Sequence, residues 1–169
     1  MAEAELHDGQ RLLAFNDLFI GAKSHVSARY ELHVGSRTEE QSSSGILVST
    51  GAGSTGWMSS VFNMVQGVSR AISEAPTAVS RPQLAWTDRR LRWAVREPFQ
   101  SRTTGVSLVT GEIDQGDELV IESRMPHGGV IFSDGVESDF LDFDGGTIAR
   151  IRVASQSVNL VVPHSNWKR

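Results

Sequence analysis

The chain has 169 residues, a net charge of −4 and no cysteine. This length is that of one domain with a full hydrophobic core, and the 39% of hydrophobic residues argues against a disordered chain. The acidic balance argues against a nucleic-acid-binding or membrane-surface protein, and without cysteine there is no disulfide framework or thiolate metal site. The sequence has no run of about 18 apolar residues and no signal-peptide core. We therefore expect a soluble single domain, residues 1–169, in the cytoplasm or in an organellar matrix.

Strand signals dominate the chain. Runs rich in β-branched and aromatic residues lie about 8 to 15 residues apart with turn residues between them, which is typical of an antiparallel sandwich. The predicted strands are 12–20, 30–34, 46–50, 91–96, 104–110, 118–123, 130–133, 147–153 and 158–162. The segments 38–44 and 73–82 have the composition of loops. The predicted fold class is mainly β, an antiparallel β-sandwich-like domain with one main α-helix.

Two adjacent polar residues, Asn16 and Asp17, interrupt the apolar run of the first predicted strand. Polar groups inside such a run need hydrogen-bond partners. A bound hydroxylated ligand is one way to supply those partners. A bulge or a polar pair at the end of the strand is the other, and the residues alone do not choose between them.

The segment from Gly45 to Trp57 joins a buried-type strand to a helix through a turn rich in glycine, serine and threonine. Free N–H groups at the start of a helix favour phosphate or sugar oxygens, so this junction is a candidate ligand site. The alternative is an ordinary strand-to-helix turn, which prefers the same residue types. The segment is not a Walker loop, because no lysine follows the glycines, and not a nucleophile elbow, because Ala52 replaces a required glycine.

One helix is predicted, over about 57–73. Apolar residues recur there at three- and four-residue steps, as on one face of a helix: Val61, Met64, Val65, Val68 and Ile72. The pattern predicts a helix start near Ser54 or Thr55, with either hydroxyl as the cap of the first turn.

Charged residues are unevenly spread over the second half of the chain. Leu91, Trp93 and Val95 alternate with three arginines, Arg90, Arg92 and Arg96, which predicts a strand with one apolar and one cationic face. Those arginines are either phosphate contacts or a solvated outer face. A later acidic cluster consists of Asp134, Asp139, Asp142 and Asp144. Its spacing is not that of a calcium loop, so it is predicted to form turns. The histidines are not at the spacing of zinc ligands. We therefore expect no metal site.

The singled-out segments, in this order, resemble the C-terminal domain of the NAD kinase family. That family has an Asn-acidic pair in a strand, as in Phe15 to Ile20, followed by Gly-x-x-x-Ser-Thr-x-x-Gly-Ser-Thr-x-aromatic, as in Gly45 to Trp57. Further similarities are at 96–99, 130–135 and 146–151, so the resemblance extends from about Leu12 to Val162. The residues from Gln41 to Gly45, which precede the strand, and the Arg-Glu-Pro segment at 96–98 are most similar to the mitochondrial-type branch and its bacterial relatives.

The resemblance implies an NAD-binding and oligomerisation domain, with a homodimer the expected assembly, of a phosphotransferase that converts ATP and NAD to ADP and NADP. It implies NAD or NADP as the ligand of this domain, with ATP and Mg²⁺ needed only by the full enzyme. Asn16 and Asp17 are then expected to hydrogen-bond ribose hydroxyls on the nicotinamide side of NAD. The other implied NAD-binding residues lie at the start of the helix: Thr55, Gly56, Trp57 and Ser60.

Four departures from the family pattern concern activity and contacts. The Gly-Gly-Asp-Gly loop that carries the family's catalytic aspartate is missing, so the N-terminal kinase domain is expected to be absent and the chain alone inactive. Ser44 replaces an acid, Asp17 replaces the usual Glu, and Trp57 replaces the usual Tyr. The alternatives are a non-catalytic module for ligand sensing or self-association, and a relative that phosphorylates a lipid or sugar hydroxyl.

Overall fold

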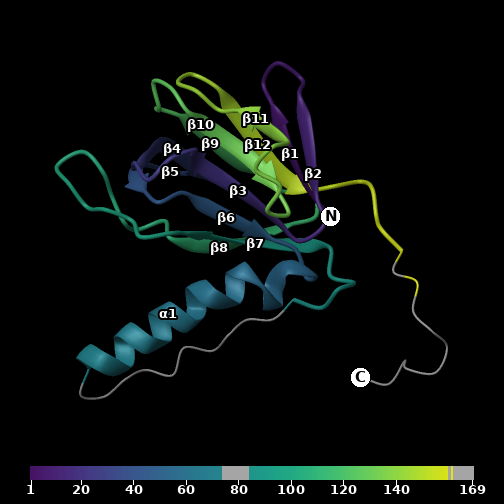
Figure 1. The fold of residues 1–169 in the computed structure, drawn as a ribbon, viewed down its shortest axis with the longest axis horizontal. Helices are drawn as coiled ribbons and strands as arrows, with labels where there is room; N and C mark the ends of the chain where they lie inside the picture. Colours follow the sequence, from purple (N-terminus) through teal and green to yellow (C-terminus); the bar gives the residue numbers. More distant parts are fainter. Residues whose placement is uncertain (74–83, 160, 162–169) are drawn as a thin grey trace.

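The computed structural model describes residues 1–73, 84–159 and 161. These residues form two antiparallel six-stranded sheets that face each other, and one helix (Figure 1). In spatial order, the first sheet consists of β2 (Arg11–Ala14), β1 (Ala2–Leu6), β12 (Ile148–Val153), β9 (Leu119–Ser123), β4 (Ala28–Val34) and β5 (Arg37–Ser43). The second sheet consists of β11 (Phe140–Asp142), β10 (Gly129–Ser133), β3 (Asp17–Ala22), β6 (Ile46–Ser49), β7 (Arg90–Val95) and β8 (Thr110–Asp114).

The main core lies between the two sheets. It is built from alternate residues of each strand, which is why Leu18 and Ile20 of β3 point inward while Phe19 does not belong to this cluster. In β7, Leu91, Trp93 and Val95 belong to this core, so the predicted apolar face of this strand is confirmed. The predicted fold class is also confirmed, with two antiparallel sheets and one main helix.

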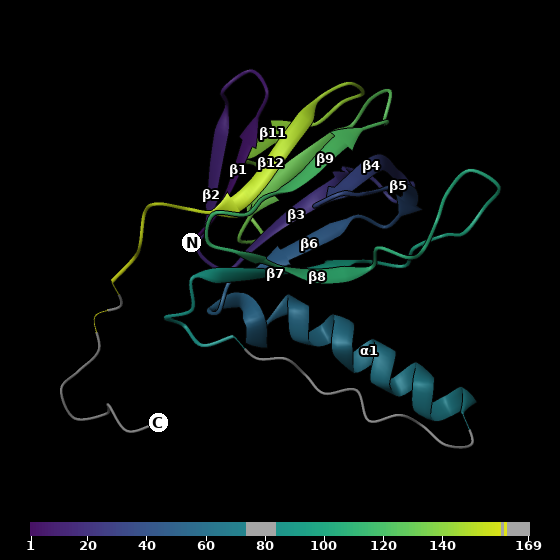
Figure 2. The same ribbon diagram turned by 180° about the vertical axis from the view of Figure 1, so that it is seen from behind.

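Helix α1 (Trp57–Ile72) follows a short 3-10 turn, η1 (Gly53–Thr55), and lies on the outer side of the second sheet (Figures 1 and 2). Its first half packs on this sheet through Met58, Val61 and Phe62, which contact Leu47 of β6 and Ala94 of β7. Its second half diverges from the sheet and leaves the predicted apolar stripe largely exposed: Met64, Val65, Val68 and Ile72 are 46%, 42%, 53% and 80% exposed. The predicted helix is therefore confirmed, but the sheet covers only part of its apolar face. No helix among the described residues is long and apolar enough to cross a membrane.

The prediction of one strand over 12–20 is wrong. The chain forms β2, turns at Phe15 and Asn16, and enters β3 at Asp17, because the carboxylate of Asp134 accepts three backbone N–H groups at this turn. The predicted strand at 104–110 is also wrong, since only Thr110 belongs to a strand, namely β8. Residues 158, 159 and 161 are not in a strand, and the rest of the predicted strand 158–162 lies outside the described residues, as does most of the predicted loop 73–82.

The segment 38–44 was predicted to be a loop, and most of it forms β5. Its polarity is misleading because Gln41 and Ser43 point into the protein and are almost fully buried. The Tyr30 hydroxyl lies 3.1 Å from Gln41 Oε1 and 2.7 Å from Ser43 Oγ, and Gln41 donates to the carbonyl of Leu108 at 2.8 Å. A satisfied polar network thus replaces apolar packing at this edge of the first sheet.

Candidate functional site

The structure brings the Asn16–Asp17 pair directly against the Gly45–Trp57 segment. Thr50 joins them through two hydrogen bonds: its N–H donates to the carbonyl of Asn16 at 2.9 Å, and its hydroxyl donates to the carbonyl of Phe15 at 2.6 Å. Gly53 approaches so closely that a Cβ there would lie 2.4 Å from the Asn16 carbonyl oxygen and 2.6 Å from Asp17 Oδ1. Only glycine fits at this position, so the two segments form one site.

Asp134 fixes the backbone of the Asn-Asp pair. Its carboxylate accepts N–H groups from Phe15, Asn16 and Asp17 at 2.9, 2.6 and 3.1 Å, and its own N–H donates to the carbonyl of Asp17 at 2.9 Å. Asp134 adopts a left-handed backbone conformation with φ of 52°, which aspartate tolerates in a tight Asp-Gly turn. The turn at Asp134 was predicted, but its contact with Asn16, 118 residues away in the sequence, was not.

The Asp17 side chain is largely buried and one of its oxygens, Oδ1, has no hydrogen-bond partner among the described residues. Burial raises the pKa of this carboxyl to about 6; the nearby Ser49 hydroxyl opposes the rise and the Asp134 carboxylate adds to it. A buried acceptor without a partner is unfavourable.

The start of α1 differs from its prediction. Gly56 is the N-cap residue, and neither Ser54 nor Thr55 caps the helix with its side chain. The Ser54 hydroxyl is buried and donates to the Gly51 carbonyl at 2.7 Å, so it holds the turn together. Thr55, Gly56 and Ser60 are exposed at the surface, where a ligand has access to them.

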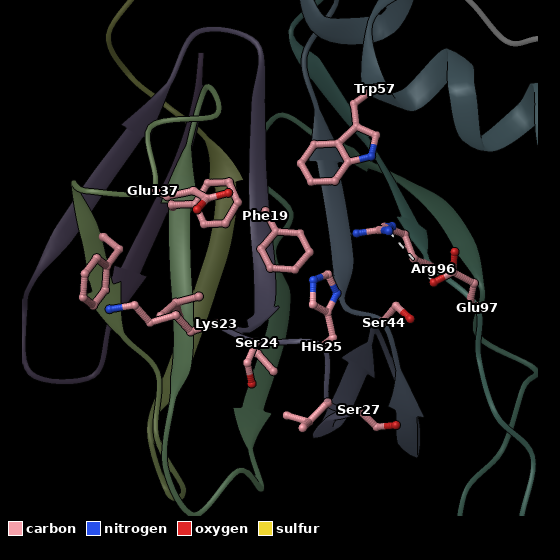
Figure 3. Close-up of a pocket in the computed structure, with 15 residues that line it drawn as sticks. Phe19, Lys23, Ser24, His25, Ser27, Ser44, Trp57, Arg96, Glu97 and Glu137 are labelled. Atoms are coloured by element: carbon pink, nitrogen blue, oxygen red, sulfur yellow. Dashed lines mark ion pairs between the residues drawn. The ribbon is translucent and has the colours of Figure 1, made fainter.

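Trp57 is the first residue of α1 and lies beside Phe19 of β3. The two rings are almost parallel, at 7° with centroids 5.6 Å apart, and Figure 3 shows them next to each other on one wall of a cavity. Phe132 of β10 continues this aromatic surface, with its centroid 4.9 Å from that of Phe19. The Arg96 guanidinium lies 5.1 Å from the Trp57 centroid and 5.9 Å from that of Phe19. These four residues form what we call the aromatic shelf, which suits a flat ring that carries an anionic group.

The cavity beside the aromatic shelf has a volume of about 530 Å³. Its polar lining includes Lys23, His25 and Glu137 from the loops around β3 and β10, together with Ser44 (Figure 3). Of the six predicted site residues, Trp57 alone lines this cavity. Asn16 and Asp17 lie at the other end of the site, beneath Gly53.

Two neighbouring arginines have a different role from Arg96. Arg90 and Arg92 on the outer face of β7 both pair with Glu112 of β8. The Arg90 side chain is 44% exposed, as expected for a solvated face, whereas the Arg92 side chain is only 14% exposed. Trp86 lies beside the two segments of the candidate site, and the sequence did not indicate it. Its side chain is 60% exposed, and its ring contacts that of Phe15 edge to face, with centroids 6.4 Å apart. The carbonyl oxygen of the preceding residue, Ala85, packs on Gly51: a Cβ added to Gly51 would lie 2.0 Å from this oxygen.

Comparison with solved structures identifies this architecture. One similar structure is yeast NADH kinase complexed with NADH, with a TM-score of 0.59 and 16% identity over 89% of this chain and 39% of that chain. Another is an NAD kinase from Archaeoglobus fulgidus in complex with ATP, with a TM-score of 0.58 and 16% identity over 92% of this chain and 51% of that chain. No family model and no curated protein sequence matches the chain. The chain thus spans about two fifths to one half of the length of these kinases, and it has an NAD kinase-like fold.

Proposed function

We propose that this chain is the NAD-binding and oligomer-forming domain of an NAD kinase-like phosphotransferase, of the mitochondrial-type branch or its bacterial relatives. The observation that carries the proposal is the unpartnered Oδ1 of Asp17, buried against Gly53 in the turn before α1. A diol such as a ribose supplies hydroxyl donors to the Asp17 carboxylate, and the neighbouring Asn16 amide provides a donor and an acceptor. The NAD kinase-like fold and the ordered sequence segments support the same ligand.

In this proposal, the remaining predicted residues contact other parts of the bound NAD. Thr55, Gly56 and Ser60 are exposed at the start of α1, where the hydroxyls of Thr55 and Ser60 can meet phosphate or ribose oxygens. Trp57 offers its ring to a base, because a planar base stacks on an aromatic side chain with a free energy of about 1–3 kcal/mol. The chain's own contribution is therefore binding and orientation of NAD or NADP.

Phosphoryl transfer itself is assigned to a second half of the enzyme. The reaction moves the γ-phosphoryl group of ATP to the 2′-hydroxyl of the adenosine ribose, and the base that the family uses lies in a Gly-Gly-Asp-Gly loop that this sequence lacks. The Asp134 carboxylate is not free to bind Mg²⁺, since both of its oxygens already accept backbone N–H groups. ATP and Mg²⁺ accordingly belong to the other domain.

Titration calorimetry tests the binding half of the proposal. NAD or NADP is expected to give saturable heat with the folded chain, and Asn16→Ala is expected to remove most of that heat. No heat at millimolar ligand, with a chain whose folding is confirmed by circular dichroism, would contradict an NAD site. Light scattering in the same buffer is expected to show a dimer.

A second candidate is a non-catalytic module for ligand sensing or self-association. It is favoured by Ser44, which lines the cavity where the family has a carboxylate. Mixing the chain with a separately produced domain that carries the Gly-Gly-Asp-Gly loop separates the two candidates. NADP formation in the mixture supports the phosphotransferase, and binding without turnover supports the module.

A further inference from the structure

Three side chains of metal-ligating type gather on the outer face of the first sheet, which is not the sheet that carries the NAD site. Glu31 and His33 come from β4 and Glu122 comes from β9. One ligand atom of each lies within 4.8 Å of the others, and all three side chains are partly exposed, at 26%, 32% and 27%. The sequence spacing did not indicate this cluster because Glu122 is brought in by strand pairing, directly opposite Glu31.

The carboxylates in this region are arranged in a row across three strands. Glu40 of β5 pairs with Glu31, and Glu31 pairs with Glu122, so three acidic residues stand side by side. Like charges directly opposite each other destabilise a sheet. Among the ion pairs of the described residues, one guanidinium contacts the row: Arg124 bonds one oxygen of Glu31 at 2.9 Å and one of Glu122 at 2.8 Å. Arg29 lies on the same side of β4 and is exposed. The row keeps an excess of negative charge and carboxylate oxygens that Arg124 does not occupy.

The imidazole of His33 is oriented toward these oxygens. Its Nδ1 lies 3.0 Å from the hydroxyl of Thr38 on β5, and its Nε2 lies 3.3 Å from Glu31 Oε1. With the proton on Nδ1 and donated to Thr38, the lone pair of Nε2 faces the space between the carboxylates. Histidines that bind metals have this arrangement, in which a partner on one ring nitrogen fixes the tautomer and the other nitrogen coordinates the ion.

We propose that Glu31, His33 and Glu122 form a divalent-cation site for Zn²⁺ or a similar ion such as Co²⁺. An imidazole ligand favours these ions over Mg²⁺ and Ca²⁺, which prefer oxygen ligands alone. Three protein ligands leave room for water in the coordination sphere. The ion links β4 to β9 and relieves the repulsion between Glu31 and Glu122. This site is independent of the proposed NAD site, since its residues belong to the other sheet.

The test is titration of the metal-free, tag-free chain with zinc chloride by calorimetry, and with cobalt chloride by visible absorption. The wild type is expected to bind one ion. His33→Gln and Glu122→Gln are each expected to weaken the affinity at least ~10-fold, and Thr38→Val by about 10-fold through loss of the ring's partner. Arg124→Gln is expected to strengthen it, because a nearby positive charge is removed. His127→Gln, which removes an exposed histidine elsewhere, is the matched control.

Two results would overturn the proposal. One is the absence of saturable binding of Zn²⁺ to the wild type. The other is an affinity for His33→Gln and Glu122→Gln equal to that of the His127→Gln control, with circular dichroism showing that all variants are folded. Either result would mean that Arg124 and His33 balance the carboxylates without a metal ion.

Discussion

Replacement of Gly53 by alanine probes the contact that joins the two parts of the proposed NAD site. The added Cβ would lie 2.4 Å from the Asn16 carbonyl oxygen and 2.6 Å from Asp17 Oδ1, whereas real Cβ contacts essentially never fall below 3.0 Å. Either the turn or the start of β3 must therefore move by several tenths of an ångström. Such overpacking destabilises a protein by about 1–3 kcal/mol. The same movement disturbs the Asp17 carboxylate, so NAD affinity is expected to fall together with stability.

Urea unfolding followed by far-ultraviolet circular dichroism measures the loss of stability, and calorimetry measures the loss of NAD affinity. Gly67→Ala is the matched control, because no atom lies within 4 Å of the Cβ added at that position in α1. That variant is expected to gain about 0.5–1 kcal/mol, since alanine favours a helix interior more than glycine does. A Gly53→Ala variant as stable as the wild type, with unchanged NAD affinity, would refute the close contact.

Substitutions at three further residues test individual groups of the proposed site. Asp17→Asn is expected to raise the free energy of unfolding at pH 8, because ionised Asp17 is unfavourable in the folded protein. This gain should shrink as the pH falls below about 6 and vanish below the ordinary pKa of 3.8. Urea unfolding across this pH range measures it. Trp57→Ala is expected to weaken NAD binding by about 1–3 kcal/mol in calorimetry, while Trp57→Phe retains most of the affinity. Equal NAD affinities of the Trp57→Ala and Trp57→Phe variants would argue against stacking. Asp134→Ala leaves the N–H groups of the Asn16 turn without their acceptor and is expected to destabilise the fold by about 2 kcal/mol in urea, whereas Asp134→Asn should lose less.

The sequence predicted those elements whose pattern is set by their own residues. The apolar spacing in α1 and the alternation in β7 arise from local periodicity, and both elements were found where expected. Strand β1 was not predicted, although Ala2, Ala4 and Leu6 are buried while two glutamates alternate with them. Alanine has a low strand preference, so this alternation gives a weak signal.

Elements that depend on distant partners could not be predicted. The turn between β2 and β3 exists because Asp134 lies beside it in space, and β5 is a strand with a polar interior because Tyr30 and Leu108 satisfy Gln41. Neither contact can be inferred from the neighbouring residues in the sequence. In both cases the hydrophobic pattern was a poor guide, since hydrogen bonding rather than apolar burial determines the structure.

The candidate site was predicted in part. The two sequence segments with unusual polar and glycine content do meet, through Thr50 and Gly53. The aromatic shelf was only partly indicated, because Phe19 and Phe132 look like ordinary strand residues until strand pairing places them side by side. The binding roles of the six residues remain predictions.

The most direct test of the central claim is a titration of the isotope-labelled chain with NAD, followed by nuclear magnetic resonance of the backbone amides and the tryptophan indoles. The account predicts that the largest shifts occur at Asn16, Asp17, Gly53 and Thr55 and at the Trp57 indole, while amides on the outer face of the first sheet, such as that of Glu122, do not change. Saturable shifts confined to residues outside the site, or no shifts at millimolar NAD, would contradict it.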